Sequence, residues 1–148
     1  MAASAIRIRG LDPGLARMGW GVIDVNGTRL CHVAHGVLTS NAKSDLGARL
    51  FALHEALCVV IAGHRPAAIA VEQAFVAKDP SAALKLGHAR AVALLAAAQA
   101  GLEIAEYAPN NGKKSVVGTG HAGKAQVLLM VRRLLPTAGV KTAVAADA

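Results

Sequence analysis

Aromatic side chains are scarce in this chain, where two Phe, one Trp and one Tyr make up 3% of 148 residues. Hydrophobic residues still account for 54% of the sequence, and alanine supplies much of that share. A core with so few rings must be filled by closely packed helices against a modest sheet. The length suits one domain with a sizeable core, so we expect residues 1–148 to form a single domain.

Metal-type cysteine spacing, long apolar runs and a secretion signal are also lacking. Cys31 and Cys58 share no such spacing, which favours free thiols in a reducing cytoplasm. Apolar runs such as Ala91 to Ala98 are far shorter than the roughly 20 residues of a membrane-spanning helix. The N-terminus lacks the apolar stretch of a signal peptide. We therefore expect a cytoplasmic protein that has no membrane partner.

Acidic residues are few, and the last third of the chain is nearly without them. The chain has 16 Lys plus Arg against 9 Asp plus Glu, a net charge of +7. From Tyr107 onward there are six basic residues and a single acid, Asp147. A basic face of this kind is typical of proteins that bind nucleic-acid phosphates, because binding releases counterions. A basic surface that only aids solubility is the alternative.

The hydrophobic pattern predicts an α/β fold, a five-stranded mixed sheet flanked by helices on both faces. Three strands should form a meander that turns at Asn26-Gly27. The expected strands are 6–11, 19–25, 29–38, 67–71 and 102–108. The expected helices are 46–62, capped by Ser44 or Asp45, 80–99, capped by Asp79 and Gly101, 109–117, 121–135, and one from 142.

Helical spacing identifies the side chains that we expect to be buried. The first helix should bury Leu46, Leu50, Leu53, Leu57 and Ile61. The second should turn inward Leu84, Ala91, Leu94 or Leu95, and Ala98. The second helix is rich in small residues on more than one side, so it is also a candidate dimer interface.

Two carboxylates stand where predicted strands end. Asp12 comes just before the turn Pro13-Gly14, and Glu72 ends the fourth strand. If the two strands are neighbours, the acids lie side by side, which costs energy unless a cation compensates them. Asp147, at the start of the last expected helix, is a third candidate, although it can equally complement the helix dipole. Such acids on a basic protein predict phosphodiester hydrolysis by paired Mg²⁺ ions about 4 Å apart. A solvated surface acid is the alternative for each residue alone.

Candidate DNA contacts lie beyond these acids. Phe75 follows Glu72 in a loop, where an aromatic ring either joins the core or stacks on an unpaired base. Lys113, Lys114 and Lys124 surround a glycine-rich break, and we expect them to contact phosphates. A solvated basic face is the alternative for the lysines.

Four segments resemble, in order and in spacing, the RuvC family of Holliday-junction resolvases: GLDPGLARMGWGVID, VEQAFVAKDPSAALKLGHARAVALLAA, EYAP and KKSVVGTGHAGKAQ. The resemblance implies a ribonuclease H-like fold and a homodimeric, Mg²⁺-dependent endonuclease in which Mn²⁺ can substitute. Such enzymes nick two opposed strands of a four-way DNA junction in recombination and repair. The resemblance also implies a branch-migration complex of the RuvA and RuvB type as a partner.

The family's motifs assign roles to individual residues of this chain. They imply metal ligation by Asp12, Glu72 and Asp147, a junction-centre aromatic at Phe75, and phosphate contacts at Lys113 and Lys124.

Val144 stands where the family has an acid or a His. Residues 144 and 147 share a helix face, and valine cannot ligate a metal. We therefore predict either a resolvase or, as the alternative, a junction-binding protein with weakened cleavage. A third hypothesis, an actin-like phosphotransfer domain, needs a second phosphate loop and an adenosine pocket, and the sequence shows neither. We also expect the final helix to be cut short at Ala148.

Overall fold

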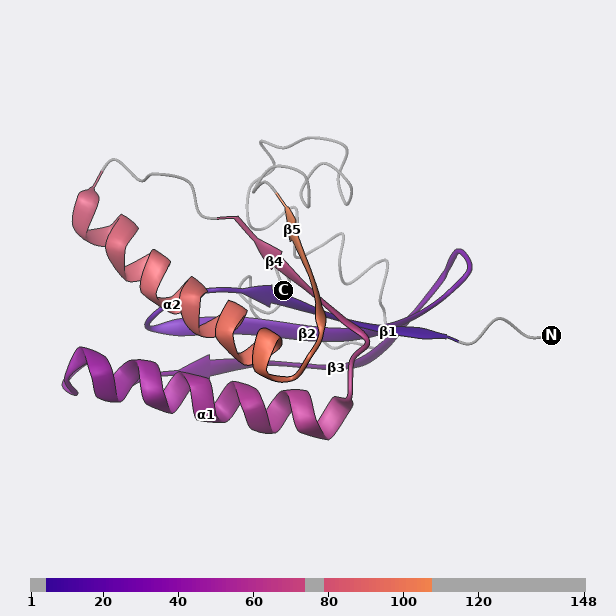
Figure 1. Ribbon diagram of the computed structural model, residues 1–148, viewed down its shortest axis with the longest axis horizontal. Helices are drawn as coiled ribbons and strands as arrows, with labels where there is room; N and C mark the ends of the chain where they lie inside the picture. Colours follow the sequence, from indigo (N-terminus) through magenta and orange to yellow (C-terminus); the bar gives the residue numbers. More distant parts are fainter. Residues whose placement is uncertain (1–4, 74–78, 108–148) are drawn as a thin grey trace.

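A computed structural model of the chain describes residues 5–73 and 79–107. Its elements, in chain order, are β1 (Ile6–Asp12), β2 (Arg17–Asn26), β3 (Arg29–Thr39), α1 (Leu46–His64), β4 (Ala68–Glu72), α2 (Pro80–Gln99) and β5 (Glu103–Tyr107). Within these residues the strands form one sheet in the order β3-β2-β1-β4-β5. The first three pair antiparallel, and β4 pairs parallel with both β1 and β5 (Figure 1). The expected five-stranded mixed sheet is confirmed, and the helices expected beyond residue 107 lie outside this description.

Local sequence signals account for most of the boundaries. Gly27 has a φ of 59°, which the turn between β2 and β3 requires. The Asp79 carboxylate accepts a hydrogen bond of 3.0 Å from the Ser81 amide and caps α2. Gly101, with a φ of 69°, ends α2 in a Schellman motif, in which the Leu102 amide donates to the Ala97 carbonyl. Asp45 occupies the N-cap of α1 as expected, but its side chain makes no capping hydrogen bond.

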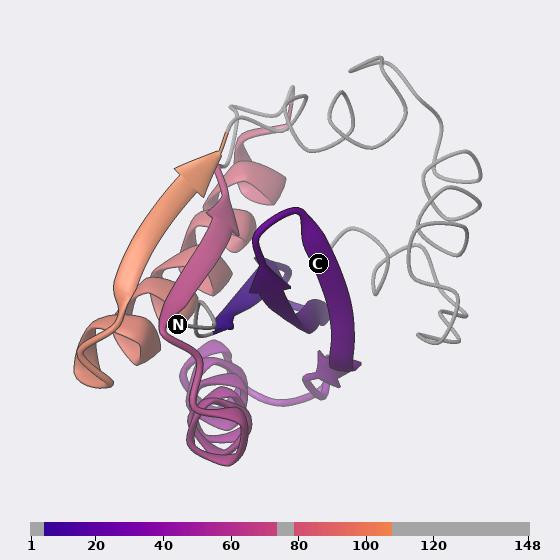
Figure 2. The same ribbon diagram turned by 90° about the vertical axis from the view of Figure 1, so that its right-hand side faces the viewer.

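Both described helices pack on one face of the sheet (Figures 1 and 2). The core between them and the sheet contains Leu53, Leu57 and Ile61 of α1, as their spacing predicted. Leu50 packs at the edge of this core, whereas Leu46 is 43% exposed because it lies at the open first turn. The two cysteines are free thiols, as expected.

The prediction for the inner side of α2 was wrong, except at Leu94, which packs against the core. The buried residues of α2 are Ala89, Val92, Ala93, Ala96 and Ala97. Leu84 and Leu95 are 66% and 53% exposed, and Ala91 and Ala98 are exposed as well. Alanine occurs all round this helix, so its sequence has little amphipathic contrast, and the smallest side chains face inward because they let α2 approach the sheet closely.

One of the described helices, α1, is long and apolar enough to cross a membrane by length and composition alone. Core helices of soluble proteins meet the same criterion. In this structure Leu53, Leu57 and Ile61 pack against the sheet, which accounts for part of the apolar character of α1.

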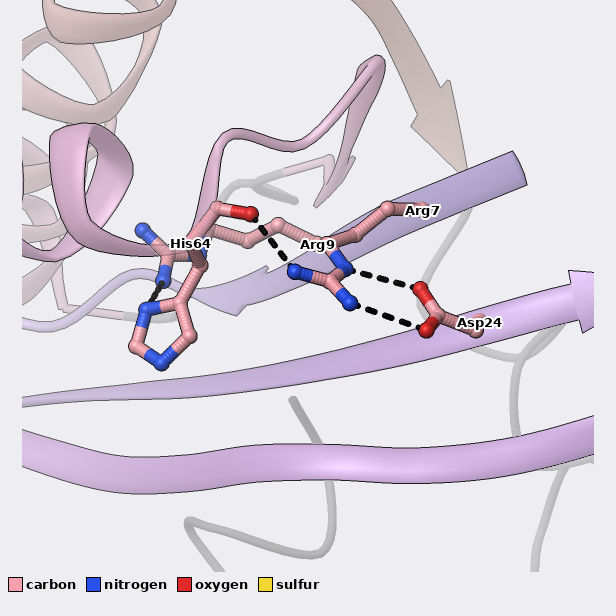
Figure 3. A network of polar contacts seen from close by, with 4 residues as sticks. All are labelled: Arg7, Arg9, Asp24 and His64. Atoms are coloured by element: carbon pink, nitrogen blue, oxygen red, sulfur yellow. Dashed lines mark hydrogen bonds and ion pairs between the residues drawn. The ribbon is translucent and has the colours of Figure 1, made fainter. Parts of the chain in front are cut away.

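A polar network joins β1 and β2 to the C-terminal end of α1 (Figure 3). Arg7 donates to both carboxylate oxygens of Asp24, at 2.7 and 2.9 Å, and to the main-chain carbonyl of His64 at 3.0 Å. These hydrogen bonds lower the pKa of the Asp24 carboxyl group. The carbonyl of His64 belongs to the last turn of α1, where no helical partner is available. The ion pair therefore also ties the end of α1 to the sheet.

Arg9 belongs to the same network and is fully buried, and its Nη2 atom lies 3.3 Å from His64 Nδ1 (Figure 3). Its Nη2 atom lies 3.2 Å from the Val60 carbonyl, and its guanidinium stacks 5.0 Å from the centre of the Trp20 ring. Within the described part of the chain, Nε and Nη1 of Arg9 have no hydrogen-bond partner. Burial lowers the pKa of Arg9 to about 10. The protein thus accepts a buried cation that is only partly compensated.

We predict that Arg9→Met raises the free energy of unfolding by about 1 kcal/mol, because an apolar side chain removes the desolvation cost. The substitution leaves no orphan carbonyl, since His64 Nδ1 also lies 2.9 Å from the Val60 oxygen. Urea unfolding measures the change. The matched control, Arg7→Met, strands Asp24 and should destabilise the protein. A loss of stability in Arg9→Met as large as that in Arg7→Met contradicts the prediction.

Candidate metal centre

Asp12 and Glu72 come together at one edge of the sheet. The parallel register of β1 and β4 pairs Leu11 with Val71, and each acid is the next residue on its strand. Leu11 and Val71 are buried toward the helices, so strand alternation places both carboxylates on the opposite face. Neighbouring strands lie about 4.8 Å apart, which makes these side chains neighbours. The pairing of these two strands, which the sequence prediction required, is confirmed.

The turn after Asp12 is fastened on several sides. Leu15 is 7% exposed and belongs to the core. Its carbonyl accepts a hydrogen bond of 2.5 Å from Ser40 Oγ, which in turn accepts one of 2.9 Å from Arg49 Nε. At Gly14 an added Cβ would lie 2.2 Å from the Arg17 carbonyl oxygen. The turn is therefore tight, and Asp12 stands on a rigid support.

The end of β4 is bonded both to the neighbouring strand β5 and to helix α2. The Gln73 amide donates to the Tyr107 carbonyl at 2.6 Å, which continues the pairing with β5 by one residue. Arg90 of α2 donates from Nε to the Glu72 carbonyl at 3.3 Å and forms an ion pair with Glu106 of β5. Neither Arg90 nor Glu106 is among the residues predicted from the sequence, because nothing in the sequence indicates that α2 crosses the end of β4.

The two carboxylates fit a magnesium site. Mg²⁺ takes oxygen ligands and is commonly bound by one or two carboxylates together with substrate phosphates. Among the residues in 5–73 and 79–107, no group of three or more His, Cys, Asp or Glu side chains is placed to hold a metal. Of the three predicted metal ligands, Asp12 and Glu72 are the two that lie within the described residues. The other residues of the predicted site lie outside the described ranges: Phe75, Lys113, Lys114, Lys124, Val144 and Asp147.

Comparison with known protein families identifies one matching family. Residues 8–148 match the family model described as crossover junction endodeoxyribonuclease RuvC. A protein of that description from Parvibaculum lavamentivorans is 60% identical over 139 residues, which are 94% of this chain and 79% of the relative. Another from Methylocella silvestris is 57% identical over 148 residues, covering 100% of this chain and 84% of the relative.

Solved structures agree in fold. The Thermus thermophilus RuvC in complex with a Holliday junction substrate has a TM-score of 0.84 at 33% identity, covering 97% of this chain and 88% of that one. The yeast mitochondrial Holliday junction resolvase Ydc2 has a TM-score of 0.66 at 14% identity, covering 99% and 77%. The second likeness concerns the fold alone. These neighbours confirm the predicted ribonuclease H-like class.

We predict that Gly14→Ala destabilises the protein by about 1–3 kcal/mol, since the new methyl group must displace main-chain atoms in the tight turn. Urea unfolding gives the value. Gly47→Ala on the exposed first turn of α1 is the control, because a Cβ there meets nothing within 4 Å. Alanine is the better helix former, so the control should be neutral or slightly more stable. Equal stability of the two variants would show that the turn is not tight.

Proposed function

The chain belongs to the RuvC family of crossover junction endodeoxyribonucleases, and we propose that it resolves Holliday junctions by metal-assisted hydrolysis centred on Asp12 and Glu72. It is a phosphodiester hydrolase of DNA recombination and repair. The observation that supports the proposed site is the Leu11–Val71 register, which brings the two acids side by side. We also propose that residues 1–148 form one nuclease domain that acts in the cytoplasm.

The acids have a defined chemical task in this proposal. Asp12 and Glu72, joined by Asp147, would hold Mg²⁺, with two ions in each site and Mn²⁺ as a substitute. Bound magnesium supplies charge stabilisation at the phosphate and a more acidic water. The rigid turn behind Asp12 and the fastened end of β4 keep the carboxylates in place before the metal binds. Mg²⁺ favours carboxylate oxygens among protein ligands.

Val144 is the reason to retain a second candidate function. A site that lacks one ligand binds metal less tightly, while the DNA contacts need not change. The second candidate is therefore a junction-binding protein with weakened cleavage. We assign those contacts to Phe75 and to the lysines Lys113, Lys114 and Lys124.

A homodimer provides the symmetry that paired nicks require, because two opposed cuts need two sites related by a two-fold axis. The outward face of α2 supports an interface there. This helix buries alanines and exposes Leu84 and Leu95, which is the reverse of what burial within one subunit favours. A branch-migration complex of the RuvA and RuvB type is the further partner that we propose.

We predict that Asp12→Asn and Glu72→Gln each slow junction cleavage in Mg²⁺ by more than about 100-fold. The loss should be this large because removing even a hydrogen-bond partner of a metal ligand lowers metal affinity or activity by about 10–100-fold. Val144→Asp should cut faster than the parent chain, and Val144→Ala, which adds no ligand, should not. The measurement is cleavage of a synthetic four-way junction, with gel shifts in EDTA on four-way and linear DNA.

The outcomes separate the candidates. Junction-selective binding with cutting supports the resolvase, and binding without cutting supports the second candidate. No preference for the junction contradicts both. Equal rates for the parent chain and Val144→Asp would show that Val144 does not limit cleavage, and full activity in Glu72→Gln would exclude that residue as a ligand.

We predict that Leu84→Glu combined with Leu95→Glu gives monomers at concentrations where the parent chain is dimeric. Each buried leucine at an interface centre is worth about 1 kcal/mol or more, and a buried carboxylate adds a further cost. Sedimentation equilibrium measures the shift. Phe51→Glu on α1, where the side chain is 63% exposed, is the control that should remain dimeric. Dissociation by the control alone would place the interface on α1.

A further inference from the structure

Arg90 of α2 makes two contacts at the end of β4, on the face of the sheet opposite to Asp12 and Glu72. Arg90 donates from Nε to the Glu72 carbonyl at 3.3 Å. Its guanidinium also donates from Nη2 to the Glu106 carboxylate. Glu72 is followed by Gln73, whose amide bonds to Tyr107, and there β4 ends. Arg90 therefore binds the main chain of β4 at the last residue of the strand.

The geometry of the sheet shows how this grip works. Val71 pairs with Glu106, and Glu72 pairs with Tyr107, so Glu106 shares the helix face with Val71. Arg90 approaches on that same face from α2, whereas the Glu72 side chain points to the other. The hydrogen bond from Arg90 goes to the main chain of Glu72, which determines where its Cα–Cβ bond points. Arg90 thus acts on the carboxylate through the backbone.

Arg90 is the more buried member of its ion pair with Glu106. The Arg90 side chain is 19% exposed, and that of Glu106 is 39% exposed. The bond to Glu106 orients the planar guanidinium of Arg90, so that its Nε is directed at the Glu72 carbonyl. Small errors in the placement of a reacting group are expensive, since a shift of about 1 Å can cost about 100-fold in rate.

We propose that Arg90 is a positioning residue for Glu72, with Glu106 as the counter-ion that aims it. The proposal rests on the proposed function, in which Glu72 is a metal ligand. A role in stability alone is the competing explanation. The two differ in what they predict for metal affinity in the folded protein, which only a positioning role changes.

The test compares Arg90→Gln with Arg7→Gln. Arg7 is a close match, because it too joins a carboxylate, Asp24, and a main-chain carbonyl, but away from Glu72. Mn²⁺ affinity of the DNA-free protein is measured by electron paramagnetic resonance of the unbound ion. The Mg²⁺ concentration for half-maximal junction cleavage is measured alongside it. Thermal unfolding and junction affinity in EDTA complete the set.

Arg90→Gln should weaken Mn²⁺ binding about tenfold or more and raise the Mg²⁺ midpoint by a similar factor, as expected for a partner behind a ligand. Junction affinity in EDTA should not change. Arg90→Lys keeps a donor and should recover part of the metal affinity, and Glu106→Gln should have a smaller effect. Arg7→Gln should lower thermal stability without changing metal affinity.

Unchanged Mn²⁺ affinity in folded Arg90→Gln overturns the proposal, as does an equal loss in Arg7→Gln. If Arg90→Gln does not fold, Arg90→Lys and Glu106→Gln decide by the same criterion. Glu72→Gln, measured in parallel, distinguishes a failure of the metal-ligand role of Glu72 from a failure of the positioning role of Arg90. If it binds Mn²⁺ and cuts normally, the proposed function of Glu72 fails. If it loses both while Arg90→Gln loses neither, only the positioning role fails.

Discussion

The register between β1 and β4 is the constraint on which the site depends. Leu11 pairs with Val71, and both side chains are buried against the helices. Because side chains alternate along a strand, the next residue on each strand must face the other way, and both of those residues are acids. A slip of one residue would turn one carboxylate into the core. The core and the candidate metal centre are therefore two faces of the same pairing.

The helix layer serves this pairing in two ways. Leu53, Leu57 and Ile61 of α1 supply the bulk that covers the sheet. Helix α2 contributes alanines on its inner side, so it can lie close enough for Arg90 to reach the end of β4. The same choice leaves Leu84 and Leu95 outside. Close packing within the subunit and an apolar outer surface are thus linked in one helix.

Arginines between the sheet and the helices bind main-chain carbonyls at both ends of the sheet. Arg7 and Arg9 meet the C-terminal end of α1, where Arg7 has Asp24 as its carboxylate partner and Arg9 lies 3.3 Å from His64 Nδ1 (Figure 3). Arg9 also contacts the Trp20 ring and the Val60 carbonyl. Arg90 meets the end of β4 and pairs with Glu106. Main-chain carbonyls at the ends of elements lack regular partners, and a guanidinium can bond to one while it keeps a counter-ion.

The sequence by itself determined the strands, the two described helices, the caps of α2 and the resemblance that identified the family, because these depend on local periodicity and on motifs of adjacent residues. It also marked Asp12 and Glu72, since each is the polar residue that ends an apolar strand. Tertiary structure alone decided which side of α2 is buried, because an alanine-rich helix carries little amphipathic signal and the distance of approach selects the smallest side chains. It also decided the partners of Arg7, Arg9 and Arg90. Those contacts join residues 11 to 57 positions apart, and the ones that involve α1 or α2 exist only once the helices lie across the sheet.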